Sequence, residues 1–353
     1  MSTQTSLSPN GNGAVTRKAS DYASDQEVRW CPGCGDYSIL KQVQKVFADL
    51  GLDPDQVAII SGIGCSSRFP YYLKTYGMHS IHGRAPAFAS GLRMANPDLS
   101  LWMITGDGDG LSIGGNHLIH LLRRNFNLNL LLFNNQIYGL TKGQYSPTSE
   151  VDKRTKSTPM GSLDHPINPL AIAMGADATF VARSMDRDPK HLQAMLHRSH
   201  QHTGASFLEI YQNCNIFNDG AFFAFTDKKT KAATAIFLEH GQPLVFGQDR
   251  NKGIRINGLR PEVVDLRDGT FSQDDLWIHD ERDMYKAQIL ARFFDDPTDA
   301  GDDYLPRPFG VFYEADRPCY EELLFAQLNE AKEKKGSGDL DALLSGGTTW
   351  DIE

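Results

Sequence analysis

The alternation of short apolar runs with helical patterns constrains the fold of this chain more than any other feature. Buried strands are predicted in QVAIISGIGC (56–65), LSLWMITGDGDG (99–110), NLNLLLFNN (127–135) and ASFLEIYQNC (205–214). Helical patterns occupy 36–50, 85–96, 113–124, 165–175 and 188–200. Strands that alternate with helices form a parallel sheet with helices on both faces. The sequence therefore predicts an α/β fold built on a parallel sheet.

Changes in composition divide the chain into three parts. Residues 1–27 begin with a stretch rich in Ser, Asn, Gly and Thr, which predicts a tail that is disordered or ordered only on a partner. Residues 28–220 hold the alternating pattern. Residues 221–353 contain acidic stretches with Pro and Gly, such as FFDDPTDAGDDYLPRPFG. We expect them to form a C-terminal extension, or arm, at a subunit interface.

Composition excludes several classes of function. The 353 residues are 40% apolar and 22% charged, which is ordinary for a soluble globular protein. A net charge of −9 argues against nucleic-acid binding. No apolar run reaches the roughly 18 residues of a membrane-spanning helix, and no signal-peptide pattern is seen. We therefore expect a cytoplasmic protein whose cysteines are metal ligands or redox groups rather than disulfides.

Two strand ends carry residues suited to a metal and a diphosphate. Asp107 lies in Gly-Asp-Gly-Asp after one predicted strand, and Asn135 lies in Asn-Asn after the next, 28 positions later. Parallel strands place both at the same edge of the sheet, where open sheets bind ligands. Carboxylate, amide and carbonyl oxygens suit Mg²⁺, and the glycines allow a diphosphate to approach. The alternative is two ordinary turns, because Asp, Asn and Gly are common turn residues.

The chain has five cysteines, Cys31, Cys34, Cys65, Cys214 and Cys319. A Cys-x-x-Cys pair alone is typical of a zinc site or a redox dithiol, and four cysteines can hold structural zinc. Four thiolates are also what a [4Fe–4S] cluster requires. The closely spaced cysteine run of bacterial ferredoxins is absent, so at most one cluster is expected.

Several motifs occur together and in order: WCPGCG, GIGCSSR, HGRA, GDGD and NNQIYGLTKGQ, followed by a late cysteine. Over about residues 28–330 the chain resembles the β subunit of a two-subunit 2-oxoacid:ferredoxin oxidoreductase, and it is most similar to the 2-oxoglutarate branch. The resemblance implies a thiamine diphosphate-binding fold. It also makes residues 28–220 a domain that binds thiamine diphosphate, Mg²⁺ and one [4Fe–4S] cluster.

The motifs carry the roles of the family onto individual residues. Mg²⁺ would be held by Asp107, the Asn135 side chain and the Ile137 carbonyl. The cluster ligands would be Cys31, Cys34, Cys65 and Cys214, which leaves Cys319 as an ordinary buried thiol. Thiamine diphosphate would be lined by Ile63, Gly64, Cys65, Ser66, His82, Gly83, Arg84 and Ala85, and its diphosphate end would contact Gly108, Asp109, Gly139 and Leu140.

The resemblance also implies the reaction. A 2-oxo acid is oxidatively decarboxylated with coenzyme A to acyl-CoA and CO₂, or the reverse, and the electrons pass through the cluster to ferredoxin. In this family the glutamate that activates thiamine comes from the α subunit, and no motif supplies one here. We therefore expect the chain to be inactive alone and to work in an α2β2 heterotetramer.

Two residues are candidates for chemistry at the substrate. His82 is a candidate acid or base, or else a structural histidine packed at the cofactor. Lys142, in GLTKGQ, is a candidate for binding the distal carboxylate of 2-oxoglutarate, or else a solvated loop lysine. Arg84 either pairs with an anion or caps a helix.

Other functions remain open at this point. The substrate could be pyruvate or a broad range of 2-oxo acids. The chain could also be a non-redox thiamine diphosphate lyase with structural zinc, or a cofactor-free scaffold that only transmits electrons. Iron and sulfide analysis separates the first of these from a cluster protein, and bound thiamine diphosphate excludes the second.

Overall fold

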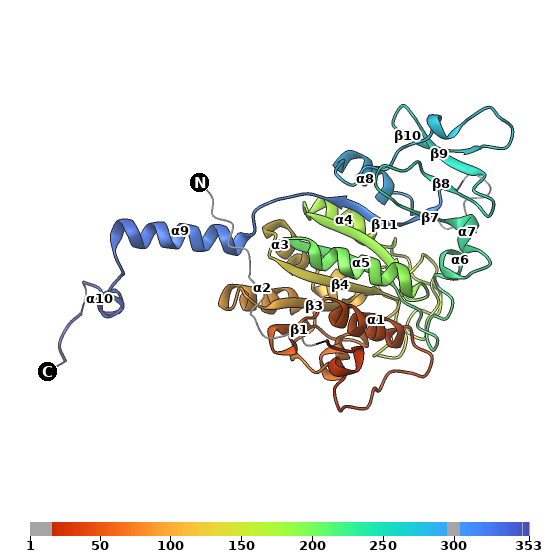
Figure 1. The fold of residues 1–353 in the computed structure, drawn as a ribbon. Coiled ribbons are helices and arrows are strands. Elements are labelled where there is room, and N and C mark those ends of the chain that lie inside the picture. The colour runs from red at the N-terminus through yellow and green to blue at the C-terminus, as the bar shows by residue number, and fades with distance from the viewer. Residues whose placement is uncertain (1–15, 295–303, 348, 353) are drawn as a thin grey trace.

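A twisted eight-stranded sheet forms the centre of the computed structural model, which describes residues 16–294, 304–347 and 349–352 (Figure 1). In sheet order the strands are β2 (Tyr76–His79), β1 (Val57–Ser61), β3 (Ser100–Gly106), β4 (Leu128–Asn134), β6 (Ala205–Tyr211), β5 (Phe180–Met185), β11 (Arg307–Glu314) and β7 (Ala235–Phe237). The strands from β2 to β5 are parallel, whereas β11 runs antiparallel to β5 and β7 follows the direction of β11. The predicted fold class is confirmed.

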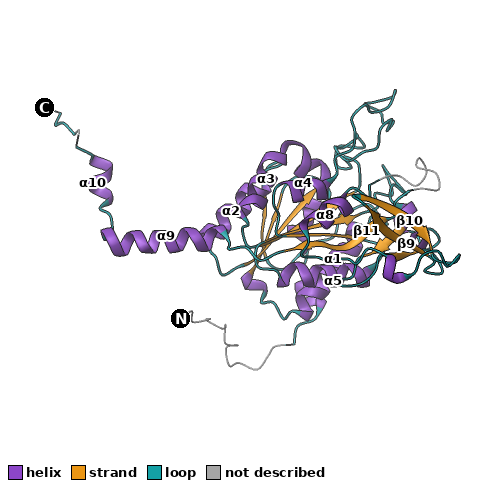
Figure 2. Ribbon diagram, turned by 90° about the horizontal axis from the view of Figure 1, so that it is seen from above, coloured by secondary structure: helices purple, strands orange, loops and turns teal. Residues whose placement is uncertain are grey.

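Helices cover both faces of this sheet (Figures 1 and 2). One face packs against α1 (Asp36–Asp49) and α5 (Pro189–Gln201). The other packs against α2 (Ala85–Ala95), α3 (Gly115–Arg124), α4 (Pro169–Gly175) and α8 (Met284–Ala291). Each central strand serves both cores because successive side chains alternate between faces. On β4, Leu130 and Leu132 enter one core, while Leu131 and Phe133 enter the other.

The sheet contains strands that the apolar pattern did not predict. In β5 the pattern is broken by Arg183, a residue that is rarely buried without a partner. The sheet register places Arg183 opposite Glu209 on β6, and the two fully buried side chains form an ion pair of 2.6 Å. The short β2 is exposed along its length, and β11 belongs to the segment that we expected to form a C-terminal extension or arm.

The described part of the N-terminal segment, 16–27, packs against the body. Tyr22, in the 3₁₀ helix Ala19–Tyr22, is fully buried, and its hydroxyl donates to the carbonyls of Phe47 and Leu52. An aromatic ring with a satisfied hydroxyl is enough to fix so short a segment. Residues 16–27 therefore order on the chain itself, whereas we expected a tail that is disordered or ordered only on a partner; residues 1–15 lie outside the described part.

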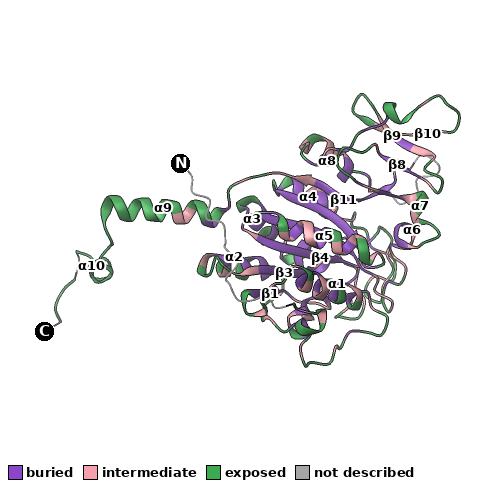
Figure 3. Cartoon of the chain, in the orientation of Figure 1, coloured by how far each residue is buried: buried purple, intermediate pink, exposed green. Residues whose placement is uncertain are grey.

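The C-terminal extension contributes to the sheet and also leaves it. Besides β7 and β11 it contains a small antiparallel sheet of β8 (Val245–Phe246), β9 (Lys252–Asn257) and β10 (Arg260–Asp265), and the short helices α6 (Phe223–Thr226) and α7 (Lys231–Thr234). After β11, α9 (Tyr320–Lys335) and α10 (Leu340–Ser345) project away from the body and are almost entirely exposed (Figures 2 and 3). The role of this arm at a subunit interface stays a prediction. Among the described helices, none combines the length and apolarity needed to cross a bilayer.

Candidate functional site

A cavity of about 580 Å³ opens at the carboxyl ends of β3 and β4. It is lined by Ile63, Gly64, Cys65, Ser66, His82, Gly106, Asp107, Gly108, Asp109, Phe133, Asn135, Ile137, Tyr138, Gly139, Leu140, Thr141, Gln144 and Tyr145. The two strand ends singled out in the sequence therefore meet in one cavity, as expected for an open parallel sheet. The volume is typical of a site for a cofactor-sized ligand.

Asp107 is buried at the floor of this cavity and is held by two hydroxyl groups. Its Oδ2 accepts hydrogen bonds from Ser146 Oγ at 2.5 Å and from Thr148 Oγ1 at 2.6 Å. Burial raises the pKa of Asp107 to about 6, and the two hydroxyl groups act against that rise. Backbone hydrogen bonds from Gly108 and Asp107 itself also lower this pKa, so the carboxylate is held from several sides.

The Asn-Asn pair shapes the neighbouring loop. Asn134 donates to Glu209 Oε1 at 2.8 Å and points away from the cavity. Asn135 lines the cavity, and its Oδ1 accepts from the Ile137 backbone N–H at 3.2 Å. No described group donates to the Ile137 carbonyl. An acidic oxygen, an amide oxygen and an unpaired carbonyl thus come from adjacent strand ends, a donor set that suits Mg²⁺.

Asp109 is committed to holding three segments together. Its Oδ1 accepts from the backbone N–H groups of Ile63 and Gly83 at 3.0 and 2.7 Å, and it lies 2.8 Å from His82 Nδ1. Its Oδ2 accepts from Thr105 at 2.6 Å. The His82 side chain, at 38% exposure, sits at the rim of the cavity with one ring nitrogen engaged by this carboxylate. Asp109 therefore acts on a ligand through the loops it fixes.

The other residues of the HGRA motif lie behind the cavity wall. Gly83 has a φ of 68°, and a Cβ there would stand 2.5 Å from the backbone nitrogen of Gly114, so only glycine fits. Arg84 donates to the Ile113 carbonyl at 3.2 Å, and Ala85 is the buried first residue of α2. None of the three lines the cavity, and their placement supports the loop that carries His82.

Lys142 lies at the exposed tip of the turn that follows the Asn-Asn loop. The turn closes through Tyr138, whose backbone N–H donates to the Gln144 carbonyl at 2.9 Å. Lys142 takes a positive φ of 75° there and is not part of the cavity lining. Within the described chain its ammonium group is not brought to the cavity, although its neighbours Leu140 and Thr141 are.

Four of the cysteines come together at one corner of the same sheet edge, which we call the cysteine corner (Cys31, Cys34, Cys65 and Cys214). A Cβ atom placed on Gly139 would stand 3.4 Å from the Cys65 sulfur and 3.7 Å from the Cys214 sulfur. Hydrogen bonds tie the Cys31–Cys34 turn to this point. Trp30 Nε1 donates to the Cys65 carbonyl at 2.7 Å, and Asn215 donates to the Pro32 carbonyl at 2.7 Å.

Two thiols of this corner, those of Cys34 and Cys65, lie in surroundings that favour the protonated form. Burial raises the pKa of Cys65 to about 12 and raises that of Cys34 still further, and the Asp36 carboxylate adds to both. Cys31 is exposed. Within the described ranges no three Cys, His, Asp or Glu side chains already form a metal-binding arrangement. Ligation would deprotonate the thiols and draw them together.

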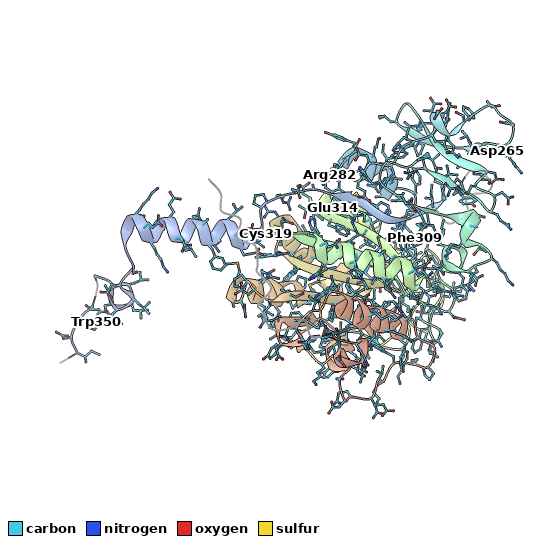
Figure 4. The ribbon with its side chains drawn as sticks, in the orientation of Figure 1. Asp265, Arg282, Phe309, Glu314, Cys319 and Trp350 are labelled. Atoms are coloured by element: carbon cyan, nitrogen blue, oxygen red, sulfur yellow. The ribbon has the colours of Figure 1, made fainter. Side chains whose placement is uncertain are left out.

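Gln212 joins the cavity to the cysteine corner, a link that sequence reasoning missed. Its Oε1 accepts from Asn135 Nδ2 at 2.7 Å, and its Nε2 lies 3.2 Å from the Cys34 sulfur. Its position at the end of β6, two residues before Cys214, was the available signal. Cys319 is buried at the start of α9, where Figure 4 labels it.

Sequence reasoning also missed the residues that support Asp107 and close the cavity. Ser146 and Thr148 carry no motif, and a loop must fold back for their hydroxyls to reach Asp107. Tyr138 packs on the Gly-Asp-Gly turn, where its hydroxyl donates to the Gly108 carbonyl at 2.9 Å. A Cβ on Gly108 would stand 2.2 Å from that ring, so the glycine is required for the contact. Tyr138 lies within the quoted NNQIYG motif and could have been singled out.

Comparison with known proteins extends this picture. Residues 62–210 match the family model described as "Thiamine pyrophosphate enzyme, C-terminal TPP binding domain". The chain is 51% identical to the 2-oxoglutarate oxidoreductase subunit KorB of Mycobacterium tuberculosis, over 96% of this chain and 89% of that protein. It is 44% identical to the β subunit of 2-oxoacid:ferredoxin oxidoreductase 1 of Aeropyrum pernix, over 58% of this chain and 64% of that protein.

A solved structure shares the fold over nearly the whole chain. It is the 2-oxoglutarate:ferredoxin oxidoreductase of Magnetococcus marinus, with 2-oxoglutarate, coenzyme A and succinyl-CoA bound. The TM-score is 0.74 at 32% identity, and the match covers 96% of this chain and 98% of that one. The similarity therefore includes the C-terminal extension as well as the thiamine-binding domain.

Proposed function

Because the chain belongs to the 2-oxoacid:ferredoxin oxidoreductase family as a β subunit of the 2-oxoglutarate branch, we propose that, with an α subunit, it oxidises 2-oxoglutarate with coenzyme A to succinyl-CoA and CO₂, or runs the reverse. Electrons pass through one [4Fe–4S] cluster to ferredoxin. One observation carries the proposal: Cys65 lines the same cavity as Asp107 and Asn135. A cluster held there would adjoin the thiamine cofactor.

The donor set of the cavity fits Mg²⁺ and a diphosphate. Asp107, the Asn135 side chain and the Ile137 carbonyl would hold the metal, and water and diphosphate oxygens would complete its shell. The diphosphate end would contact the backbone of Gly108, Gly139 and Leu140. When bound, thiamine diphosphate supplies the carbanion chemistry that cleaves the bond between the keto and carboxylate carbons.

The residues of this chain position and shield that chemistry. Phe133, Ile137 and Leu140 give the cavity apolar walls that exclude water, which strengthens electrostatic interactions inside it. Asp109 fixes the loops that carry Ile63 and His82, and so sets the shape of the opposite wall. His82 would act on the substrate through its free ring nitrogen or serve only as a wall.

The cysteine corner fits a cluster better than structural zinc because of its position. Four cysteines from three separate segments converge at the mouth of a cofactor cavity, and Gln212 hydrogen-bonds both Cys34 and the metal-binding Asn135. A structural zinc has no need of such a link. The reduced thiols that a cluster requires agree with a cytoplasmic location.

An α subunit is required to complete the site. Among the described residues no glutamate lines the cavity, and its two acidic residues, Asp107 and Asp109, are committed to other partners. The glutamate that activates thiamine would come from the partner, in an α2β2 assembly. The partner would also supply any basic residue for the distal carboxylate that Lys142 does not reach.

The test uses the αβ complex purified without oxygen. We expect bound iron and sulfide at four each per β chain, and reduction of ferredoxin that depends on 2-oxoglutarate, coenzyme A and thiamine diphosphate together. Zinc in place of iron would contradict the redox role and favour a lyase. Activity with pyruvate equal to that with 2-oxoglutarate would support oxidative decarboxylation of a 2-oxo acid. It would contradict the assignment of 2-oxoglutarate as the substrate. Activity of the β chain alone would remove the need for the partner.

A further inference from the structure

A group of cationic side chains surrounds a groove on the surface formed by α1, α5 and the segment between α6 and α7. We call it the basic surface and define it as Lys45, Arg187, Lys190, Lys228, Lys229 and Lys231. These residues line a cavity of about 890 Å³ between α1, the start of α5 and the segment that joins α6 to α7 (Figure 1). A second cavity of about 340 Å³ shares Lys228 and Lys231 and adds Arg250.

Most of this positive charge is uncompensated. Two carboxylates share the lining of the larger cavity: Asp188 pairs with Lys231 at 2.9 Å, and Asp227 pairs with Arg187 at 3.2 Å. The other four lysines (Lys45, Lys190, Lys228 and Lys229) form no ion pair within the described part of the chain. Such an accumulation stands out in a chain whose net charge is −9.

The basic surface is built on the same elements as the cysteine corner. Helix α1 begins at Asp36, directly after the Cys31–Cys34 turn, and Lys45 stands on it about 14 Å further along the axis. Arg187 follows Asp186, whose carboxylate accepts from the backbone N–H of Asn213 at 2.9 Å, beside Cys214. Of the four cysteines Cys31 is the exposed one, so this corner is accessible from solvent in the isolated chain.

The chemistry of the groove favours a protein over a small anion. The unpaired lysines come from α1, α5 and the α6–α7 segment, so they are spread along the groove and do not converge on one point. Its described lining contains no glycine and no aromatic residue, and so offers neither a backbone cradle for phosphate nor a stacking surface for a base. Spread positive charge steers and orients an acidic protein surface.

We propose that the basic surface docks the acidic electron carrier that takes electrons from the cysteine corner. This inference rests on the proposed function and names where the partner binds. A cluster held by the cysteine corner would give one electron to the oxidised cluster of the carrier, and no bond or proton would change place. The carrier is a small acidic iron–sulfur protein, the chemistry that complements unpaired lysines.

The test compares two double variants of the complete αβ complex. One is Lys190→Glu with Lys228→Glu, within the basic surface. The matched control is Lys18→Glu with Lys74→Glu, two exposed lysines outside it, which changes the net charge equally. Both are assayed for reduction of a small acidic two-cluster ferredoxin that depends on 2-oxoglutarate and coenzyme A, over a range of NaCl concentrations. A parallel assay measures the reduction of methyl viologen with the same substrates.

We expect the basic-surface variant to raise the KM for ferredoxin at least about tenfold at low salt and to lose most of its salt dependence. Reduction of methyl viologen should stay at the wild-type rate, and the control variant should differ less than about twofold in both assays. The neutral double variant Lys190→Gln with Lys228→Gln should give an intermediate KM for ferredoxin. It serves as a second test if the glutamate variant fails to fold.

Three outcomes would overturn the docking surface. An unchanged ferredoxin KM with normal viologen activity would remove it and leave the proposed function intact. An equal rise of the ferredoxin KM in the control variant would show that the effect depends on net charge and not on this surface. A raised KM for coenzyme A with ferredoxin unaffected would assign the lysines to a small anion. Absence of both activities in the wild-type complex would instead reject the proposed function.

Discussion

The candidate metal-binding edge of the cavity and the cysteine corner lie side by side, yet hydrogen bonds order their side chains to different degrees. At the edge, two hydroxyls hold Asp107, and a backbone N–H and Gln212 fix the Asn135 amide. In the corner of the described chain, Gln212 and Asp36 contact the Cys34 sulfur, and Cys31 is exposed. Oxygen ligands can be preorganised by ordinary hydrogen bonds. Buried thiols have few such partners, so their final geometry depends on the ion that binds them.

The largest effect on cofactor content should come from replacing one cysteine of the cysteine corner. Cys214→Ser should lose or weaken the cluster, because it removes one of the four thiolates that would hold it. Cys319→Ser is the control, since that thiol is buried at the start of α9, away from the corner. The measurement is iron and sulfide content after anaerobic purification. Thiamine diphosphate affinity should change little in either variant; equal iron in both would show that Cys214 is no ligand.

The next effect tests the prepared edge. Asp107→Ala should weaken Mg²⁺-dependent binding of thiamine diphosphate by at least about 100-fold, because losing a ligand exceeds the 10- to 100-fold cost typical of losing a supporting contact. Iron content should stay at the wild-type level. Calorimetric titration of the complex measures the affinity, and circular dichroism checks the fold. Unchanged affinity would show that Asp107 is not a metal ligand. The hydrogen bonds that hold Asp107 would then not distinguish this edge from the cysteine corner.

A smaller change weakens the hydrogen bonding that holds Asp107 in place and leaves the carboxylate itself present. Thr148→Val deletes one hydroxyl that bonds Asp107, so we expect about tenfold weaker Mg²⁺ binding at pH 7. The control is Thr155→Val, a loop threonine that bonds only its own neighbours. A result equal to wild type would mean that Thr148 does not hold the carboxylate.

The same variant makes a prediction about pH. Burial places the pKa of Asp107 at about 6, and the protonated carboxyl cannot bind Mg²⁺. Affinity should therefore be constant above that pH and fall about tenfold per unit below it. Because the Thr148 hydroxyl lowers this pKa, Thr148→Val should move the start of the fall to higher pH. Titrations from pH 5 to 8 decide this, and a shift toward lower pH would contradict the assignment.

The smallest expected effect lies on the link between the two regions. Gln212→Leu removes a hydrogen bond to the Cys34 sulfur worth about 1 kcal/mol, which corresponds to a reduction potential lower by on the order of 40 mV. It also frees the Asn135 amide, so thiamine diphosphate affinity should fall a few-fold. Redox titration of the cluster and calorimetry measure the two. A change in only one would show that Gln212 serves one region alone.

Much of the fold was predictable because the central strands are covered on both faces and so appear as uninterrupted apolar runs. The exceptions have specific causes. The pattern of β5 is interrupted by Arg183, and only the neighbouring Glu209 makes its burial possible. Strand β11 joins the sheet edge from a region of irregular composition, and the pairing with β5 is a long-range contact. Tyr22 is a single anchor that no periodicity reveals.

The candidate site divides in the same way. Asp107 and Asn135 were identified because their spacing after strands marks them in the chain itself, and the resemblance to a known family singled out the four cysteines. Residues that act through them were not. Ser146, Thr148 and Gln212 are common polar residues whose importance lies in what they touch. Lys142 was singled out by its place after a motif, but its turn carries it to the exposed tip, outside the cavity lining.

The sequence by itself determined the layered architecture, the sheet edge that carries the chemistry and the kinds of ligand atoms gathered there. These follow from local patterns: the period of apolar residues, the glycines and amides that end strands, and the count of cysteines. The tertiary structure alone decided how Asp107 is held, how Gln212 links the cavity to the cysteine corner, and that unpaired lysines from three elements face one groove. Those features depend on contacts between segments far apart in the chain, where no local periodicity exists to encode the distance.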